Sequence, residues 1–483
     1  MTNTAELNGV HERTTAVHWF RSDLRLSDNV ALSRCSDLSS HLVTLFILDD
    51  SLLSSDRQSA ARIQFMLKCL ERLAAELAER GQRLLVRRGE PLAVLREVVA
   101  ESGARVVTWN RDTGVFARSR DERVARGLAE DGVRVETFKD RVIHEARDIA
   151  PIQNRSLAVF SPYRKAWWHR FEEHPPDPAT VLRLPPPPER VDYGPLPIAA
   201  VIDSNRLSPM FDGTRIPEAG ELGAERRLRS FLAGDIRRYK EARDFPAEEA
   251  TSRLSAYLRF GVISIRTCFR EARSAAESDS SLQRGAKKWI DELIWREFYQ
   301  AIVDDDPSVL HRNYRREFDD FEWEQDDEGF EAWRQGRTGF PFVDAGIREL
   351  LTTGHMHNRL RMVVASFLTK DLLIDWRRGE RFFMEHLVDG DPASNNGGWQ
   401  WAASTGTDAQ SFLRVFNPVL QGDRFDPDGE YVRRWIPELE ALAGGSAQRP
   451  WEQPLLAPSY PAPILDHGAR KRRAIERYSA FGG

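Results

Sequence analysis

The chain has 483 residues, of which 41% are hydrophobic and 30% are charged, and its net charge is −5. This is the composition of a globular protein with two or three domains, and no apolar run is long enough to span a bilayer. The N-terminal residues 1–15 are polar and lack the apolar core of a signal peptide, so we expect a cytoplasmic protein.

The first 140 residues alternate between strand-like and helix-like segments. A helical pattern covers 62–80, and Gly81 follows it as a stop signal. This alternation predicts an α/β domain over residues 14–140, with a parallel, Rossmann-like sheet covered by helices on both faces. The domain contains no GxGxxG and no GxxxxGK[ST] motif, so it carries no fingerprint for a dinucleotide or a nucleoside triphosphate. The five β-rich runs are 16–20, 42–48, 83–88, 105–110 and 133–138.

The remaining residues divide into a connector and a helical part. Residues 174–217 are rich in proline and predict an extended segment, within a connector that we place at 141–219. Helical patterns dominate from 220 to 483, which predicts a predominantly α-helical second domain. The clearest helix candidates are 225–245, 286–303, 342–354 and 357–379.

The sequence does not indicate metal or disulfide chemistry. Cys35, Cys69 and Cys268 lie far apart and form no CxxC pair. His355 and His357 are two residues apart, which points them in different directions on a helix, so we expect no metal site. The net charge does not indicate a nucleic-acid-binding protein, but local patches decide such binding. The 13 tryptophans can fill cores or stack on flat ligands.

Two segments of the helical part carry more polar chemistry than packing requires. In TSRLSAYLRFG (251–261), three hydroxyls stand at the expected start of a helix, where free N–H groups favour an anion such as phosphate; simple N-capping is the alternative. In WIDELIWREFYQ (289–300), Glu292, Trp295, Arg296 and Tyr299 share one helical face. Such a face indicates a binding site, and a Glu292–Arg296 ion pair is the alternative.

Two further segments combine amides with large apolar groups. In GHMHNRLRM (354–362), Asn358 and Met362 lie one helical turn apart and can present an amide and a thioether to the same ligand. The stretch GDPASNNGGWQW (390–401) brings two amides and two glycines directly before two indoles, with carboxylates just ahead of them. Flat aromatic surface, neutral hydrogen-bonding groups and close backbone approach indicate a ligand site.

Together these segments resemble the flavin domain of the DNA photolyase and cryptochrome family. The resemblance runs from AVHWFRSDLRLSDNVAL (16–32) to EYVRRWIPEL (430–439) and is closest to class I cyclobutane pyrimidine dimer photolyases. It implies an N-terminal α/β domain and a C-terminal helical domain that holds folded FAD. It also implies light-driven repair of dimers by electron transfer from reduced, anionic FAD. The most specific segments are TSRLSAYLRFG, WIDELIWREFYQ, MHNRLRMVVASFLTKDLLIDW and DGDPASNNGGWQWAASTGTDAQ.

The resemblance implies roles for individual residues around FAD. An amide from Asn395 would accept a hydrogen bond from flavin N5 without titrating near neutral pH. Plant cryptochromes carry Asp and animal cryptochromes carry Cys at that position, so Asn395 favours repair. Gly397 and Gly398 would let the backbone approach the cofactor. The residues implied for the phosphates and ribityl chain are Tyr239, Thr251, Ser252, Leu254 and Ser255. Those implied around the isoalloxazine are Glu292, Arg296, Asn358, Asp389, Asp391 and Asn395.

The resemblance also implies how damaged DNA is held, whether it is double- or single-stranded. A dimer must be flipped out of a duplex, and apolar walls would then receive it. Glu292 and Asn358 would hydrogen-bond the pyrimidine edges. For this the Glu292 carboxyl must be protonated or hold its proton through a neighbour, which burial beside an aromatic wall would favour. The residues implied for the apolar walls are Trp295, Met362 and Trp401. Those implied to grip phosphates are Arg243, Arg361 and Arg414, and a solvated surface charge is the alternative for each.

Two comparisons with the family bear on the substrate. Enzymes for (6-4) photoproducts place histidines where this chain has Asn358 and Met362, and their absence favours the cyclobutane dimer. His355 stands where the family usually has Trp, and its effect on substrate fit is open.

The resemblance further implies an electron path and an antenna. Trp323, Trp376 and Trp399 match the family's chain of tryptophans that carries electrons from the surface to the flavin, with core packing as the alternative for each. Residues 109–124 lie where a second, light-harvesting chromophore binds in the family. Folate is our first choice for this chromophore, and a deazaflavin or a flavin are the alternatives.

Three other functions are alternatives to dimer repair. A cryptochrome-like photoreceptor would bind FAD and a partner without repair; Asn395, the complete lesion-pocket set and the lack of a long extension after residue 439 argue against it. A photolyase for another lesion is a second alternative, and a flavin oxidoreductase with a nicotinamide partner is a third, without a supporting fingerprint. We expect a monomer, and we expect the basic run 470–473 to be a solvated helix face.

Overall fold

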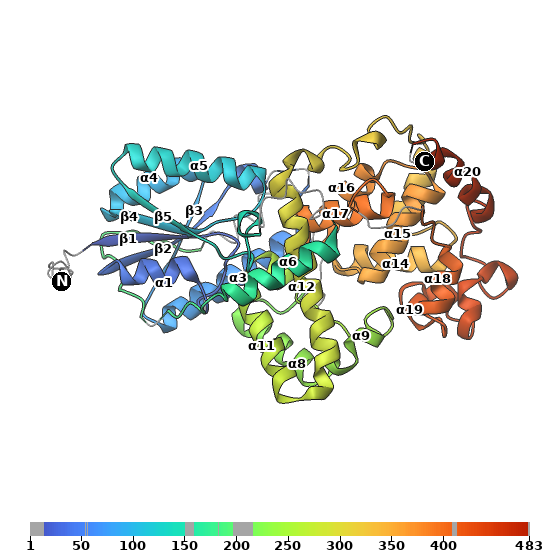
Figure 1. The fold of residues 1–483 in the computed structure, drawn as a ribbon, viewed down its shortest axis with the longest axis horizontal. Coiled ribbons are helices and arrows are strands. Elements are labelled where there is room, and N and C mark those ends of the chain that lie inside the picture. The colour runs from blue at the N-terminus through green and yellow to red at the C-terminus, as the bar shows by residue number, and fades with distance from the viewer. Residues whose placement is uncertain are drawn as a thin grey trace.

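The computed structural model describes residues 14–53, 55, 57–149, 159–181, 183–196, 216–407 and 413–481. An α/β part forms one end of the molecule and a helical part forms the other (Figure 1). The sheet lies in the α/β part, and α20 lies at the opposite end of the molecule.

The predicted parallel sheet is confirmed. Its strands pair in the order β3-β2-β1-β4-β5, and every pair is parallel. The central strand β1 has Val17 opposite Val43 of β2 and opposite Val107 of β4. The strands are β1 (Thr15–Phe20), β2 (His41–Leu48), β3 (Leu84–Arg88), β4 (Val106–Asn110) and β5 (Arg134–Phe138).

Helices cover both faces of this sheet, because successive side chains of a strand point to opposite sides. Val17 and Trp19 belong to a core shared with α4 and α5, whereas Ala16 and Phe20 belong to a core shared with α1 and α3. The helices are α1 (Val30–Asp37), α2 (Asp50–Leu53), α3 (Ala60–Glu79), α4 (Pro91–Ser102) and α5 (Val115–Glu130). Gly81, with a φ of 73°, follows α3 as predicted.

The second part is helical, as predicted. Its helices are α6 (Phe160–Glu173), α8 (Glu221–Ala233), α9 (Tyr239–Ala242), α10 (Ser255–Arg259), α11 (Ile265–Ser278), α12 (Gln283–Asp305), α13 (Asp327–Arg334), α14 (Pro341–Thr353), α15 (Asn358–Ser366), α16 (Trp376–His386), α17 (Pro392–Ala403), α18 (Pro418–Phe425), α19 (Glu430–Trp435) and α20 (His467–Ser479). Short 3-10 turns are η1 (Ala146–Asp148), η3 (Asp235–Arg238), η4 (Ser280–Leu282), η5 (Pro307–Leu310), η6 (Arg316–Phe318), η8 (Pro437–Leu439), η9 (Gly444–Gln448) and η10 (Pro450–Glu452), and η7 (Phe367–Asp371) is a π-helix.

Two of the predicted helices are interrupted. The segment 225–245 breaks at Gly234, and η3 and α9 follow. The segment 357–379 passes from α15 into η7 and then turns at Leu373, where φ is 56°, before α16 begins. Lys370, buried within η7, donates to the carbonyl of Ala403 at 2.8 Å, so the distortion serves a contact with α17.

The proline-rich connector crosses from one part to the other. The described residues 175–196 contain no helix or strand, as predicted, while 182 and 197–215 lie outside the described residues. The connector at 141–219 also contains α6, which the sequence did not predict. The core that holds Ala16 and Phe20 continues into α8, α11 and α12, so the two parts share hydrophobic packing.

Buried ion pairs also join the two parts. Arg266 of α11 pairs with Asp28 at 3.0 Å and with Asp140 at 2.8 Å, and Asp140 also pairs with Arg25 at 2.6 Å. All four side chains are buried, so each charge depends on its partners.

No helix in the described ranges is long and apolar enough to cross a membrane. No group of three or more His, Cys, Asp or Glu side chains within those ranges could hold a metal ion. Cys35, Cys69 and Cys268 are free and buried.

Candidate functional site

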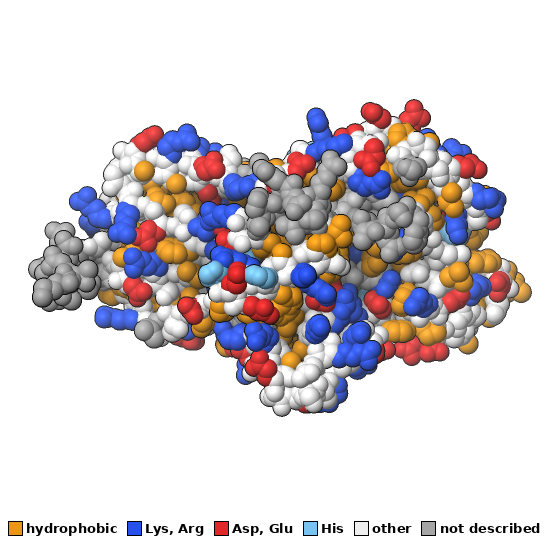
Figure 2. All heavy atoms as spheres, viewed as in Figure 1, with side chains coloured by type: hydrophobic (Ala, Val, Ile, Leu, Met, Phe, Trp, Pro, Cys, Tyr) orange, Lys and Arg blue, Asp and Glu red, His pale blue; other side chains and the backbone are white. Residues whose placement is uncertain are grey.

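A pocket of about 530 Å³ lies where the two cores of the helical part meet. One wall comes from α9, α10 and α12, and the other comes from α15, α16 and α17. It brings together residues that the sequence singled out, including members of all four motifs: Tyr239, Arg243, Ser252, Leu254, Ser255, Glu292, Trp295, Arg296, Asn358, Arg361, Met362, Asp389, Asp391, Asn395, Trp399 and Trp401. On the face in Figure 2, basic side chains gather beside α9 and α12.

The face of α12 lies on the pocket wall as predicted. Glu292, Trp295, Arg296 and Tyr299 all line the cavity, which follows from their spacing on one helix. Trp295 stacks on Phe160 of α6, with ring centroids 3.7 Å apart and planes at 6°. This stacking fixes one aromatic wall of the pocket.

The ion pair considered between Glu292 and Arg296 does not form in the described structure. Glu292 instead pairs with Arg243 and, at 2.8 Å, with Lys288. Arg296 donates to the backbone carbonyl of Arg141 at 2.7 Å. The Glu292 side chain is 27% exposed and lies between two cations.

Asn358 and Met362 lie one turn apart on α15, and both line the pocket. The Asn358 amide nitrogen is 3.9 Å from the sulfur of Met362. His357 caps the helix by accepting from the backbone N–H of Arg359 at 3.1 Å. The cap fixes the start of α15 and thereby the direction of the Asn358 side chain.

The stretch 389–401 supplies carboxylates at the start of α17. Asp391 caps α17 by accepting from the backbone N–H of Ser394 at 3.0 Å, and it pairs with Arg141 at 2.8 Å. Burial acts to raise the pKa of Asp391, but Arg141, Arg259 and Arg296 outweigh burial and hold the pKa below its ordinary value. Asp391 is therefore ionised at neutral pH.

Asn395 lies one turn further along α17. Its amide nitrogen donates to the carbonyl and to a carboxylate oxygen of Glu380, each at 3.0 Å. The amide oxygen is left as the acceptor that Asn395 can offer a ligand in the pocket.

The two glycines after Asn395 serve different purposes. A Cβ on Gly397 would overlap the ring of Tyr299, so α17 and α12 pack closely only because Gly stands there. A Cβ on Gly398 would meet nothing within 4 Å, and Gly398 lines the pocket. The expectation of close backbone approach to a ligand therefore concerns Gly398, whereas Gly397 is explained by helix packing.

Two arginines expected to face DNA phosphates are paired inside the pocket. Arg361 contacts both oxygens of Asp389, at 3.0 and 2.8 Å. Arg243 pairs with Glu292, and burial, which acts to lower the pKa of Arg243, is outweighed by that carboxylate. Both guanidiniums therefore hold the pocket carboxylates in place. Arg414 is half-buried in the loop before α18 and is not among the described lining residues.

The hydroxyl cluster differs from its prediction. Thr251 and Ser252 precede α10, whose N-cap residue is Leu254 without a side-chain cap, so the capping alternative is wrong. Ser252 and Ser255 line the pocket, and Ser255 hydrogen-bonds Asp389. Thr251 is missing from the described lining residues, and its carbonyl accepts from Arg227 at 2.5 Å. Because α10 is only five residues long, its dipole contributes little to anion binding.

Two of the three tryptophans of the expected electron path are buried, and the third is half-buried. Trp399 is buried on α17 and lines the pocket. Trp376 begins α16, is buried, and donates from its indole N–H to Asn313 at 2.8 Å. Trp323 is half-buried and lines a surface pocket together with Asp375, the residue before Trp376.

Sequence reasoning missed several residues of the site. Arg259 and Lys288 line the pocket, and Arg141 reaches its carboxylates from the connector. Arg259 lies within the motif 251–261, and Lys288 lies one turn before Glu292, so helical spacing could have revealed the latter. Arg141 and Glu380 lie outside every motif, and their roles depend on tertiary contacts.

The charges of the pocket suit an anionic ligand with a flat part. Five basic side chains line it against three acidic ones, while aromatic and aliphatic groups form much of the remaining wall. Burial is the main reason that the pKa of Arg296 falls to about 10, which still leaves Arg296 charged at neutral pH. The indole N–H of Trp399 is buried without a hydrogen-bond partner among the described atoms.

Comparisons with known proteins agree with this arrangement. A model described as DNA photolyase matches residues 16–181, and one described as the FAD binding domain of DNA photolyase matches residues 289–480. A deoxyribodipyrimidine photo-lyase from Synechococcus sp. is 40% identical over 464 residues, which cover 95% of this chain and 96% of that protein. One from Escherichia coli is 39% identical over 477 residues, with coverages of 97% and 99%.

Solved structures share the whole fold. A class III photolyase from Agrobacterium tumefaciens superposes with a TM-score of 0.88 at 35% identity, covering 99% of each chain. A photolyase from Sulfolobus tokodaii, described with two FAD molecules, gives 0.82 at 31% identity and covers 97% of this chain and all of its own. A cryptochrome from Synechocystis sp. gives 0.87 at 27% identity, with coverages of 96% and 99%.

Proposed function

The chain belongs to the DNA photolyase family, and we propose that it is a deoxyribodipyrimidine photo-lyase that repairs cyclobutane pyrimidine dimers with light. The observation that carries this proposal is the pocket of the helical part. Asn395 lines this pocket together with Asn358 and Met362 of α15. Glu292 and Trp295 of α12 line the same pocket.

FAD is the cofactor, and the pocket fits it. The excess of basic over acidic side chains suits a pyrophosphate, and the open space at Gly398 suits close approach of a ring system. When bound and reduced, FAD supplies an electron to the lesion after absorbing light. We assign the phosphates and ribityl chain of FAD to Tyr239, Ser252, Leu254 and Ser255. We assign its ring system to Glu292, Arg296, Asn358, Asp389, Asp391 and Asn395.

The residues of the chain position the lesion and exclude water. Trp295 and Trp401 offer flat apolar surface to pyrimidine rings, and Met362 offers a deformable thioether. Asn358 has both a donor and an acceptor for the pyrimidine edges. Glu292, held by Arg243 and Lys288, places a charged hydrogen-bonding group beside them. Arg414 remains our candidate for gripping a DNA phosphate outside the pocket.

We further propose that Trp399, Trp376 and Trp323 form a relay that supplies electrons to the pocket from the surface. Trp399 and Trp376 are buried and Trp323 is half-buried, and α16, which begins with Trp376, packs against α17, which carries Trp399. Indole is the most readily oxidised of the side chains that line this route. Core packing remains sufficient to explain each residue alone, so the relay needs a direct test.

A second chromophore has a candidate place between the two parts. A pocket of about 400 Å³ is lined by Arg111, Asp112, Thr113 and Arg118, all within the predicted segment 109–124, and by Asp304 and Asp305 from the end of α12. The Sulfolobus tokodaii photolyase is described with a novel light-harvesting cofactor. We propose that an antenna binds here in this chain, with folate first and a deazaflavin or flavin as alternatives. The absorption spectrum of chromophore released from the purified protein decides among them.

We propose that the protein acts as a monomer on damaged DNA, double- or single-stranded, in the cytoplasm. The domain limits that fit these roles are 14–140 for the antenna domain, 141–219 for the connector and 220–483 for the FAD- and DNA-binding domain. A cryptochrome-like photoreceptor stays the second candidate, because the Synechocystis cryptochrome shares the fold.

The test is an assay of three oligonucleotides in blue light and in darkness. The reduced protein is given a thymine cyclobutane dimer, a (6-4) photoproduct and undamaged DNA at saturating concentrations. We expect light-dependent loss of the cyclobutane dimer alone. Repair of only the (6-4) product would assign another lesion class, and binding of FAD without any repair would favour the photoreceptor.

A further inference from the structure

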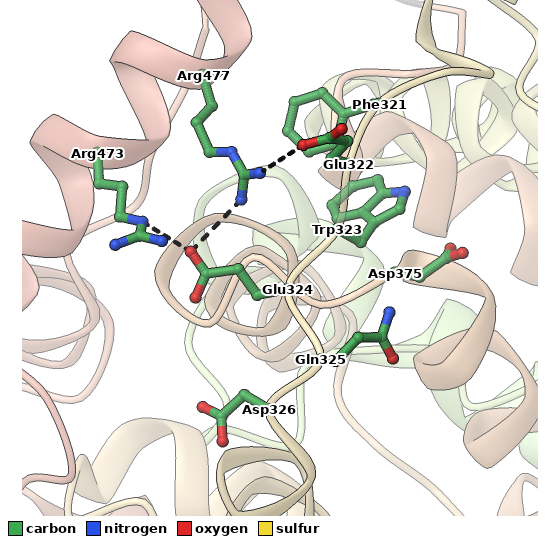
Figure 3. A pocket seen from close by; sticks show the side chains of 9 residues that line it. All are labelled: Phe321, Glu322, Trp323, Glu324, Gln325, Asp326, Asp375, Arg473 and Arg477. Atoms are coloured by element: carbon green, nitrogen blue, oxygen red, sulfur yellow. Dashed lines mark ion pairs between the residues drawn. The ribbon is translucent and has the colours of Figure 1, made fainter.

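A shallow pocket of about 710 Å³ opens at the surface beside Trp323 (Figure 3). The loop 321–326 forms most of it, and Asp375 and two arginines of α20 complete it. None of its described lining residues lines the FAD pocket. It is therefore a separate feature at the outer end of the proposed relay.

The surface of this pocket is acidic. Four carboxylates line it, from Glu322, Glu324, Asp326 and Asp375, against the two guanidiniums of Arg473 and Arg477. The Glu322 side chain is 89% exposed, and its ion pair with Arg477 is long, at 3.7 Å. A molecule that approaches the Trp323 ring therefore meets carboxylate first.

Three arginines of α20 pair with one of these carboxylates. Glu324 is paired with Arg473 at 2.7 Å, with Arg470 at 2.8 Å and with Arg477 at 3.5 Å. Figure 3 shows the Arg473 and Arg477 pairs on the side of the pocket away from Asp375. The sequence predicts that the basic run 470–473 is a solvated helix face. This is only partly correct, because Arg470 and Arg473 bind the loop that carries Trp323.

The charges also differ between the last two tryptophans. The guanidinium of Arg377 lies over the Trp376 ring, 4.9 Å from its centroid, and pairs with Asp375 at 3.0 Å. Among the described residues, no cation lies over the ring of Trp323. A positive charge left on an indole by electron loss is thus opposed at Trp376 and favoured at Trp323, beside the carboxylates.

We propose that this pocket is the docking site of an external one-electron donor, that it selects cationic over anionic donors, and that α20 sets this preference. The inference rests on the proposed relay. Trp323 that has lost one electron takes one electron from the docked donor. The donor leaves oxidised by one electron, the indole is restored, and no proton needs to move.

The test measures how fast the oxidised Trp323 is reduced after a laser flash, from the decay of its visible absorbance. The probes are hexaammineruthenium(II), a dication, and hexacyanoferrate(II), a tetraanion, each added to the FAD-loaded protein at low ionic strength. Comparing each probe across variants removes the difference in driving force between the two probes.

Three variants separate the contributions. For Glu322→Lys, the second-order rate constant should fall roughly threefold or more for the dication and rise for the tetraanion. Arg477→Gln removes a cation that pairs with Glu322 and Glu324. It should therefore raise the rate constant for the dication and lower the rate constant for the tetraanion. Glu130→Lys on α5 makes the same charge change at an exposed position of the α/β part, and it should leave both rate constants within about twofold.

The outcomes distinguish this inference from the relay itself. If Trp323→Phe does not alter the transient, the relay is wrong. If Trp323→Phe removes the transient, the relay stands. If Glu322→Lys then changes the rate constants for the two probes no more than Glu130→Lys does, the docking site is refuted. Equal effects of Glu322→Lys on both probes would also refute charge selection.

Discussion

Asn395 donates its amide N–H to Glu380 twice, to the backbone carbonyl and to the carboxylate, each at 3.0 Å. Glu380 is in turn paired with Arg57, which precedes α3 in the α/β part. The orientation of an amide at the FAD pocket is therefore set by a charge pair that spans both parts of the molecule. Burial acts to raise the pKa of Glu380, and Arg57 and Asn395 offset only part of this effect, so the pKa stays above its ordinary value.

The first prediction concerns Asn395→Asp. The substitution would place a second carboxyl group 3.0 Å from Glu380, so the two would compete for one proton and the amide oxygen would be lost as a fixed acceptor. Reduced FAD in this variant should be reoxidised in air at least about tenfold faster. Adding Glu380→Gln should restore most of the lifetime, because it removes the like charge. Wild-type reoxidation in the single variant would show that this contact does not protect the reduced cofactor.

The second prediction concerns Glu292→Gln, which keeps the size of the side chain and removes the charge that Arg243 and Lys288 contact. The repair yield per absorbed photon at saturating DNA should fall roughly threefold or more, because the group beside the pyrimidine edge and both cations rearrange. Affinity for undamaged DNA should stay the same or rise, because a negative charge is lost.

Arg414→Ala is the matched comparison for this experiment. It should weaken DNA binding and lower the slope of its salt dependence by about one, with little change in yield at saturation. An unchanged yield in Glu292→Gln would leave Glu292 as a structural partner of Arg243.

The third prediction tests the relay through Trp376→Phe. Photoreduction of oxidised FAD should slow at least about tenfold, while repair by protein that is already reduced stays within about twofold. Trp333→Phe is the control, since Trp333 is buried and lies 6.1 Å from Trp399, ring to ring, but is not one of the three relay residues. Equal photoreduction in Trp376→Phe and wild type would show that electrons take another route.

Local patterns in the sequence were sufficient for the sheet and for the faces that line the pocket. Alternation with short β-rich runs gave the five parallel strands, and spacing on one helix gave Glu292, Trp295 and Arg296. Spacing could not give the ion pairs, because the partners of Glu292 and Asp391 are Arg243 and Arg141 from other segments.

The interrupted helices show the same limit. Nothing in the pattern of 357–379 indicates a π-helix, and the buried Lys370 within it contacts the end of α17, far away in sequence. The sequence predicts that the backbone approaches the cofactor at Gly397, because it shows only that this residue has no side chain. In the structure, the ring of Tyr299 occupies the space beside Gly397.

The fourth prediction concerns pH. Burial is the main cause that lowers the pKa of His357 to about 4 from 6.5. Well above pH 6.5 the residue is neutral whether the protein is folded or unfolded, so it adds no pH dependence there. As the pH falls from 6.5 towards 4, only the unfolded chain takes up the proton, and stability is lost. This should remove about 2 kcal/mol of unfolding free energy between pH 7.5 and pH 5.

Urea titrations at the two pH values measure this loss. His357→Asn retains a capping acceptor for α15 and should show a pH dependence smaller by that amount. His174→Asn, at an exposed position after α6, serves as the control and should behave as wild type. If His357→Asn keeps the full pH dependence, the loss belongs to other groups.

The central claim is that light absorbed by reduced FAD in the pocket of the helical part drives dimer repair. The most direct measurement is the action spectrum of single-turnover repair, taken with anaerobically reduced protein at saturating thymine-dimer oligonucleotide. After the antenna has been removed, we expect repair per incident photon to follow the absorption of the bound reduced FAD from the near ultraviolet into the blue, with no repair in darkness. Dimer loss that proceeds in darkness, or that fails to follow this absorption, would contradict the account.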